Sequence, residues 1–164
     1  MLAETLARLH AAHDALLTDG LPDRGPAGLA LDRGAPAALA APARIRAVAK
    51  AAVDAGADLI RTNSAGANAS RLRPHGAQGR ADIDREQIER RSEAAERSER
   101  RVVVAGAIGP TGEIFAPMGT LRHALAVEVF HEQAEALRDG GASVLWLGGF
   151  AALAELAAAA RAAQ

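Results

Sequence analysis

The sequence predicts an α/β fold in which parallel strands alternate with helices in about four strand–helix units. Short apolar runs, rich in β-branched residues, are separated by longer stretches with helical character. Each run leads directly into a polar or glycine-containing loop. The residues that close the four runs, Asp19, Asn63, Gly109 and Gly148, follow one another at intervals of 44, 46 and 39 residues. Such regular spacing indicates β–α–β crossovers, and four units form either a small open sheet or half of an eight-stranded barrel.

The composition indicates one soluble domain over residues 1–164. This length is sufficient for a single hydrophobic core. The net charge of -1 argues against a nucleic-acid or membrane-surface partner. We see no signal peptide and no apolar run of the roughly 18 residues that a membrane span requires. We therefore expect a cytoplasmic protein. The absence of cysteine excludes disulfides, thiolate metal ligands and cysteine nucleophiles from these residues.

The four predicted strands are short and suited to burial on both faces. They are Leu16–Thr18, a strand that begins with Asp58–Ile60, Arg101–Ala107 and Ser143–Leu147. The third is the clearest, because three consecutive valines are β-branched and apolar.

The predicted helices occupy most of the remaining chain. They are Leu2–Ala15, a helix from about Pro42 to the Gly56 turn, Asp84–Arg100, Leu121–Asp139 and Ala151–Gln164. We expect Ile45, Val48, Ala52 and Ala55 to form the buried stripe of the second helix, and Val127, Phe130, Ala134 and Leu137 that of the fourth. Residues 21–43 form a long loop rich in Gly, Pro and Ala, and loops of this length in a compact domain are usually functional or disordered.

Polar residues follow the strands at their carboxyl ends, where parallel α/β proteins bind ligands. Thr62 and Asn63 follow the second strand, and Gly109–Gly112 follows the third as a tight turn whose backbone amides can approach a ligand. This turn lacks the lysine of a phosphate-binding P-loop. Asp19 ends the first strand, where its carboxylate can either hold an ammonium group or serve as a turn residue before Gly20.

Four stretches together resemble the homocysteine S-methyltransferase family, which includes betaine-type and cobalamin-type enzymes. They are Asp19–Gly20, DAGADLIRTNSAGANASRL (Asp54 to Leu72), VVVAGAIGPTGE (Val102 to Glu113) and HEQAEALRDGGASVLWL (His131 to Leu147). The resemblance covers nearly the whole chain, in the right order and spacing. It implies a (β/α)8 TIM barrel, of which this chain is similar to the N-terminal half, from the first strand through the fourth helix.

The resemblance implies methyl transfer to the thiol sulfur of homocysteine, activated by a zinc ion that three cysteine thiolates hold. It assigns Asp19 to the substrate ammonium and the Gly20 amide to its carboxylate. It places Thr62, Asn63, Gly109 and Thr111 on the floor and lip of the pocket. The family further implies a role in methionine biosynthesis.

The sequence departs from the family pattern in ways that affect activity. No cysteine is present to bind zinc, and Gly148–Gly149 replaces the glutamate–threonine pair that the family usually has after the fourth strand. The loop after Asp19–Gly20 also differs, because it reads Leu21–Arg24 instead of a small glycine-bearing turn. We therefore expect these 164 residues to be a truncated member of the family that binds no zinc and is inactive alone.

Two function classes and one fold alternative remain open from the sequence. The first is a truncated or split homocysteine methyltransferase that is active only with its other half. Because a half-barrel leaves strand edges unpaired, we expect self-association or a separate C-terminal half-barrel. The second is a non-catalytic degenerate fragment, or a binding module for a small molecule similar to homocysteine. An unrelated small α/β binding protein with an open sheet is a third reading.

Overall fold

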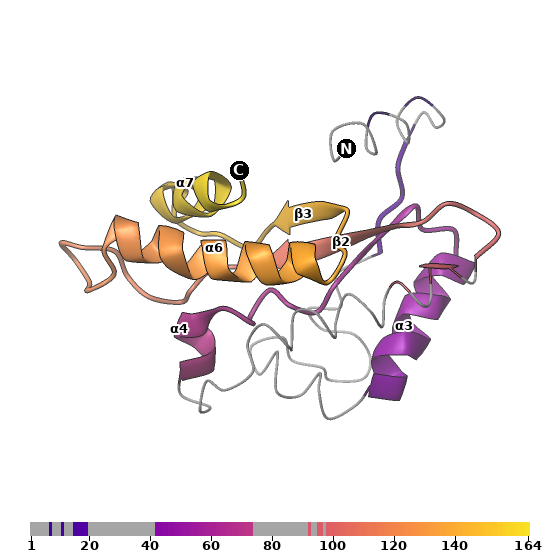
Figure 1. Ribbon diagram of the computed structural model, residues 1–164, viewed down its shortest axis with the longest axis horizontal. Helices are drawn as coiled ribbons and strands as arrows, with labels where there is room; N and C mark the ends of the chain where they lie inside the picture. Colours follow the sequence, from indigo (N-terminus) through magenta and orange to yellow (C-terminus); the bar gives the residue numbers. More distant parts are fainter. Residues whose placement is uncertain are drawn as a thin grey trace.

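A three-stranded parallel sheet forms the centre of the structure (Figure 1). The computed structural model describes residues 15–19, 42–73 and 98–164, together with positions 7, 11, 92, 95 and 96. The strands, in their order across the sheet, are β1 (Leu59–Arg61), β2 (Val103–Ile108) and β3 (Val144–Leu147). Thr18 adds a parallel bridge to Leu59, on the side of β1 away from β2. All four predicted strand segments are therefore present in sequence order, the first as a single bridge.

Helices alternate with these strands, as predicted. The described helices are α3 (Pro42–Asp54), α4 (Ala69–Leu72), α6 (His123–Asp139) and α7 (Leu153–Ala162). Helix α6 connects β2 to β3, which are parallel neighbours, so this connection is a β–α–β crossover. Helices α6 and α7 pack against each other and against β2 and β3, respectively (Figure 1).

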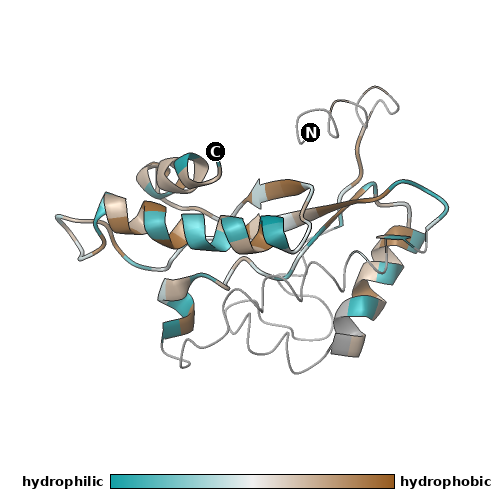
Figure 2. Cartoon of the chain, viewed as in Figure 1, coloured by the Kyte–Doolittle hydropathy of each residue, from teal (hydrophilic) through white to brown (hydrophobic). Residues whose placement is uncertain are grey.

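The main hydrophobic core lies between the strands and these helices. From the sheet it contains Ile60, Val104 and Ile108, and from the helices Phe130, Ala134, Leu137, Ala158, Ala159 and Ala162. Gly106 brings the sheet and α6 together, because a Cβ atom at this position would lie 3.1 Å from the Leu137 side chain. Figure 2 shows the result as apolar strands next to a helix α6 on which hydrophobic and hydrophilic residues alternate.

The opposite face of the sheet has its own, smaller cluster of apolar residues. Leu59, Val103, Ala105 and Val144 are buried there, with Leu16 and Trp146 packed against them. Side chains at i and i+2 share a face of a strand, so this face also carries Arg61 of β1 and Ala107 of β2. Burial on both faces explains why these strands are almost continuously apolar.

The buried stripe of α3 differs from the prediction. Val48 and Ala55 are exposed, whereas Ala49 and Val53 are buried and Ala52 is half-buried. The prediction was wrong for Val48 and Ala55, because an alanine-rich helix offers several apolar faces of similar quality. Ala52 packs against the core, and the side chain of Ile45 lies outside the described part of the structure. In α6 the prediction is confirmed for Phe130, Ala134 and Leu137, and Val127 is half-buried.

Glycine residues with left-handed φ angles form the turns that follow helices α3 and α6. Gly56, after α3, has φ 99°, the left-handed conformation expected of it. Gly140 caps α6 with helical φ, and the left-handed residue of that turn is Gly141, with φ 95°. The predicted elements do not include helix α4, whose N-cap is Asn68.

Several sequence predictions fall outside the described residues. These are most of the predicted helices Leu2–Ala15 and Asp84–Arg100 and most of the predicted loop 21–43. Residues 42 and 43 of that loop belong to the start of α3. Residues 98–100 form a bend instead of the predicted end of a helix, and the Ser98 hydroxyl accepts a hydrogen bond from the Arg100 amide there. None of the helices in the described residues is long and apolar enough to cross a membrane.

Candidate functional site

The loops after β1 and β2 meet at the carboxyl edge of the sheet. The Gly109 amide donates a hydrogen bond of 3.1 Å to the Ala65 carbonyl. A Cβ atom on Gly109 would lie only 2.8 Å from that same oxygen, so the contact requires glycine. The amide of Gly148, after β3, donates to the Ile108 carbonyl at 3.1 Å. The loops after β1, β2 and β3 therefore meet at this edge, and Asp19 reaches the same edge through its hydrogen bond from Arg61, the last residue of β1.

Thr62 and Ser64 use their hydroxyl groups to join the end of β1 to β2. Thr62 Oγ1 accepts a hydrogen bond of 2.8 Å from the Ala107 amide, and Ser64 Oγ donates one of 2.7 Å to the Ala107 carbonyl. The two hydroxyl oxygens are 2.6 Å apart, and since Ser64 already donates its proton, Thr62 is the donor between them. Thr62 and Ser64 are both buried. Their described contacts fix the backbone on either side of Asn63.

Asn63 is the predicted site residue with a buried polar atom that lacks a partner. Its Oδ1 atom is inaccessible to solvent and makes no hydrogen bond within the described residues. An unsatisfied buried acceptor costs about 1–3 kcal/mol, and native structures usually satisfy such atoms with another protein group or an ordered water molecule. The Asn63 Oδ1 atom therefore has the capacity to accept a further hydrogen bond.

The carboxylate of Glu155 holds Thr111 in place, and sequence analysis did not identify Glu155 as a residue of the site. Glu155, in the first turn of α7, accepts hydrogen bonds through Oε1 from the Thr111 amide at 2.8 Å and from its hydroxyl at 2.6 Å. Thr111 Oγ1 in turn accepts from the Glu113 amide at 3.2 Å. Both Thr111 and Glu155 are buried. Glu155 thus ties the loop after β2 to helix α7.

Asn68 and Arg71 support the same loop from the β1 side. The Asn68 amide nitrogen donates to the Gly109 and Pro110 carbonyls at 3.4 and 3.3 Å, while its oxygen caps α4 by accepting from the Arg71 amide. Arg71 Nε also donates to the Pro110 carbonyl, at 3.0 Å. These contacts make the Gly109–Pro110 segment a fixed wall of the site.

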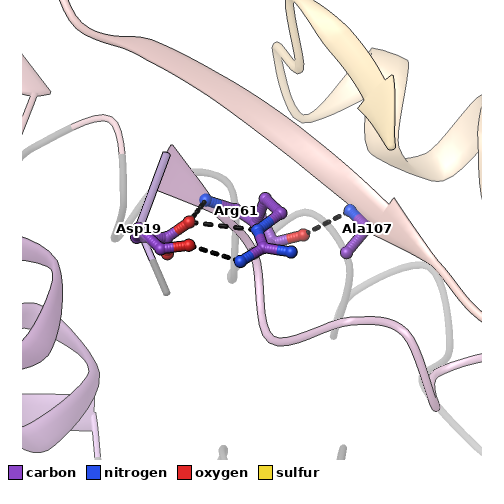
Figure 3. A network of polar contacts seen from close by, with 4 residues as sticks. Asp19, Arg61 and Ala107 are labelled. Atoms are coloured by element: carbon purple, nitrogen blue, oxygen red, sulfur yellow. Dashed lines mark hydrogen bonds and ion pairs between the residues drawn. The ribbon is translucent and has the colours of Figure 1, made fainter. Parts of the chain in front are cut away.

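Asp19 forms an ion pair with Arg61, the last residue of strand β1. Its Oδ1 atom accepts hydrogen bonds from the backbone amide of Arg61 at 3.0 Å and from Arg61 Nε at 3.1 Å (Figure 3). Arg61 Nη2 also donates to the Asp19 carbonyl. Both side chains are more than nine-tenths buried. Gly20, the other residue predicted here, lies outside the described residues.

Arg61 also reaches across the sheet to Trp146 on β3. Its Cζ atom lies 4.9 Å from the centre of the indole ring, within the range of a cation–π interaction. The residue opposite Arg61 on β2 is Ala105, whose small side chain leaves room for this crossing. Gly148 accommodates the indole, because a Cβ atom there would lie 2.9 Å from Trp146 Nε1. Sequence reasoning missed Arg61; an arginine at the end of an apolar strand was the available signal.

A second ion pair lies at the amino end of β1 and serves the fold. Asp58 receives a hydrogen bond from Arg100 Nη2 through Oδ1 and one of 3.0 Å from the Leu17 amide through Oδ2. It fixes the first strand segment to β1 at the edge of the sheet opposite the candidate site.

The described residues do not fit the zinc ion that the family resemblance implies. The sequence supplies no cysteine. Within the part of the chain that the structure describes, no three His, Cys, Asp or Glu side chains gather closely enough to hold a metal. These residues therefore provide no site at which zinc could activate a thiol.

Comparisons with known proteins agree with this architecture. The structure is similar to the homocysteine methyltransferase MmuM from Escherichia coli in its oxidised form, with a TM-score of 0.79 and 24% identity over 96% of this chain. The metallated form gives a TM-score of 0.78 at 23% identity, and the apo form 0.67 at 24% identity. This chain spans 60%, 61% and 56% of the length of those three chains, respectively. No curated protein matches the sequence significantly.

The likeness extends to the fold class and to the sequence family. The parallel sheet with alternating helices is that of a partial (β/α)8 barrel, about half of the closed structure, as predicted. The sequence profile named homocysteine S-methyltransferase matches residues 4–164, almost the entire chain. The chain therefore belongs to the homocysteine S-methyltransferase family.

Proposed function

We propose that this chain takes part in methyl transfer to the thiol of homocysteine, as the part of the enzyme that binds the amino acid. The observation that carries the proposal is the match of the family profile over residues 4–164. The contacts between the loops after β1 and β2 support it, because they form one continuous polar edge where parallel α/β proteins bind ligands.

The proposed binding residues have different tasks. Asn63 accepts a hydrogen bond from the ligand through its unpartnered Oδ1 atom. Thr62 holds Asn63 in place, and Gly109 and Thr111 form the opposing lip, fixed by Asn68 and Glu155. The Gly20 amide remains the proposed donor to the substrate carboxylate, by the resemblance alone.

We propose further that these residues do not catalyse methyl transfer by themselves. A free thiol has a pKa of about 8.5 and is mostly protonated at neutral pH, so it needs activation to become a nucleophile. In the family a zinc ion held by three cysteines supplies that activation, and this chain has no cysteine. The missing thiolates are proposed to come from residues outside these 164, which carry the other half of the barrel. A second copy of this chain could close the barrel but would add no cysteine.

The direct experiment combines binding, metal content and turnover. We expect the purified chain to contain no zinc, to bind homocysteine in calorimetry, and to form no methionine from betaine, a methyl-sulfonium compound or a methylated corrinoid. Addition of a C-terminal half-barrel with the family's cysteines, together with zinc, is expected to restore methionine formation with one of the donors. Methionine formation by the chain alone would refute the dependence on a second half.

A non-catalytic binding module is the second candidate, and the lack of cysteine favours it. This candidate also expects homocysteine binding without zinc. It differs in expecting no methionine formation with any C-terminal half, even when the two halves associate. Lack of homocysteine binding would contradict both candidates.

A further inference from the structure

The carboxylate that the family resemblance assigns to the substrate ammonium already has a cationic partner within the chain. Asp19 Oδ1 accepts two hydrogen bonds, from the backbone and from Nε of Arg61. With both side chains buried, the negative charge of Asp19 is compensated by the guanidinium before any ligand arrives. An ammonium ion at Asp19 would have to compete with this contact. Asp19 is therefore a poor anchor for the amino group of a ligand.

The same contacts leave part of the guanidinium available to an anion. Arginine has five N–H donors in a planar fork, and the contacts to Asp19 use Nε and Nη2. Nη1 makes no hydrogen bond with any described residue. In Figure 3 the guanidinium nitrogen that does not contact Asp19 points away from it. Such a fork matches the two oxygens of a carboxylate better than any other cationic side chain does.

Arg61 is also held in position before a ligand binds. Asp19 orients one edge of the guanidinium, and the Trp146 ring lies 4.9 Å from its Cζ atom. Arg61 ends strand β1 and is followed directly by Thr62 and Asn63, so it belongs to the same carboxyl edge as the proposed site. A cation fixed in this way loses little side-chain entropy on binding an anion.

From this geometry we propose that Arg61 binds the carboxylate of the ligand and that Asp19 is a positioning residue for Arg61. The ligand class is then a small carboxylate with a thiol group, and an amino group is not required. The proposal rests on the proposed function, because it specifies how the same site recognises its ligand. It reverses the charge recognition that the family resemblance assigns to Asp19.

The test compares three ligands by calorimetry on the full 164-residue chain. Homocysteine carries both charged groups, 4-mercaptobutyrate lacks the amino group, and homocysteine methyl ester lacks the free carboxylate. We expect 4-mercaptobutyrate to bind within about 3-fold of homocysteine and the ester to bind at least about 10-fold more weakly, since one charge-assisted contact is lost. If homocysteine and its ester bind equally and 4-mercaptobutyrate does not bind, Asp19 is the ammonium partner and the proposal is wrong.

Variants of the ion pair locate the effect. Arg61→Gln is expected to weaken the binding of homocysteine and of 4-mercaptobutyrate by at least about 10-fold and to leave the affinity for the ester unchanged. Because this change leaves Asp19 buried opposite a neutral group, the double variant with Asp19→Asn is measured beside it, with circular dichroism to verify folding. Arg161→Gln, an exposed arginine on α7, is the matched control and should bind like the unaltered chain. Unchanged carboxylate binding by a folded Arg61 variant would overturn the proposal.

The outcomes also separate this inference from the proposed function. Binding of 4-mercaptobutyrate without binding of homocysteine would support Arg61 as the carboxylate anchor and refute the homocysteine assignment. Binding of homocysteine that depends on its amino group would support the homocysteine assignment and refute Arg61 as the carboxylate anchor. Binding of none of the three ligands would overturn both. If the Arg61 variants do not fold, the comparison of ligands on the unaltered chain decides.

Discussion

Gly109 determines how closely the two loops of the candidate site approach each other. A Cβ atom there would lie 2.8 Å from the Ala65 carbonyl oxygen and 3.0 Å from the Ala65 Cβ atom. The oxygen belongs to the backbone, so it cannot move aside as a flexible side chain would. The close approach also allows the hydrogen bond from the Gly109 amide to Ala65. Any larger residue at position 109 must separate the loops.

We expect Gly109→Ala to destabilise the fold by about 1–3 kcal/mol, the usual cost of inserting a methyl group into a packed contact. Urea unfolding followed by circular dichroism measures the change. Gly140→Ala is the control, because Gly140 has φ -71° and ψ -7°, a conformation that alanine adopts readily. An unchanged midpoint for Gly109→Ala would show that the loops separate without cost.

Single residues also show what the sequence could and could not reveal. Thr62 and Asn63 were found because they are polar and follow an apolar strand immediately. Arg61 was missed, because its partner Asp19 is 42 residues away in sequence and only strand pairing brings the two together. Glu155 was missed for the same reason, since 44 residues separate it from Thr111. Polar contacts over such separations have no local sequence signal.

At the scale of elements, helix α7 does more than cover the sheet. Glu155 lies in its first turn, where the positive end of the helix dipole favours a carboxylate. The same carboxylate accepts two hydrogen bonds from Thr111, so the helix end and the loop after β2 stabilise each other. The packing of α7 and the shape of the candidate site are thereby coupled.

We expect Glu155→Ala to cost about 2–3 kcal/mol, because it leaves the amide and hydroxyl of Thr111 buried without their acceptor. Glu155→Gln retains an oxygen that can accept both bonds and should cost only about 1 kcal/mol. Urea unfolding of both variants tests this ranking. Equal losses would mean that the charge of Glu155 matters and its hydrogen bonds do not.

Prediction of the elements worked where the local signals agreed. Strands β2 and β3 and helices α6 and α7 were placed within two residues at most boundaries, because apolar runs and glycine turns mark their ends. The buried face of α3 was placed wrongly, because alanines surround that helix. Helix α4 has only four residues and too little periodicity to detect, although its N-cap Asn68 was visible in the sequence.

At the scale of the whole molecule, the regular interval between strand ends was enough to predict parallel pairing. It left an open sheet and a half-barrel as alternatives, because both contain the same strand–helix units. The family motifs decided between them, and the similarity to the methyltransferase structures agrees. Closure of a barrel depends on contacts between strands distant in sequence, and the spacing of four units contains no information about them.

The edge of β3 yields an expectation for association in solution. Within the described residues β3 pairs with β2 only, and Leu145, Trp146 and Leu147 are half-buried. A strand edge with apolar side chains is a template for pairing with another chain, so we expect self-association as protein concentration rises. Trp146 is the only tryptophan of the chain, so its fluorescence reports on this strand.

Sedimentation velocity should show a dimer fraction that grows with protein concentration, while quenching of Trp146 fluorescence by acrylamide decreases in parallel. A folded monomer at all concentrations would show that the β3 edge does not pair, and dimerisation without a change in quenching would place the interface elsewhere.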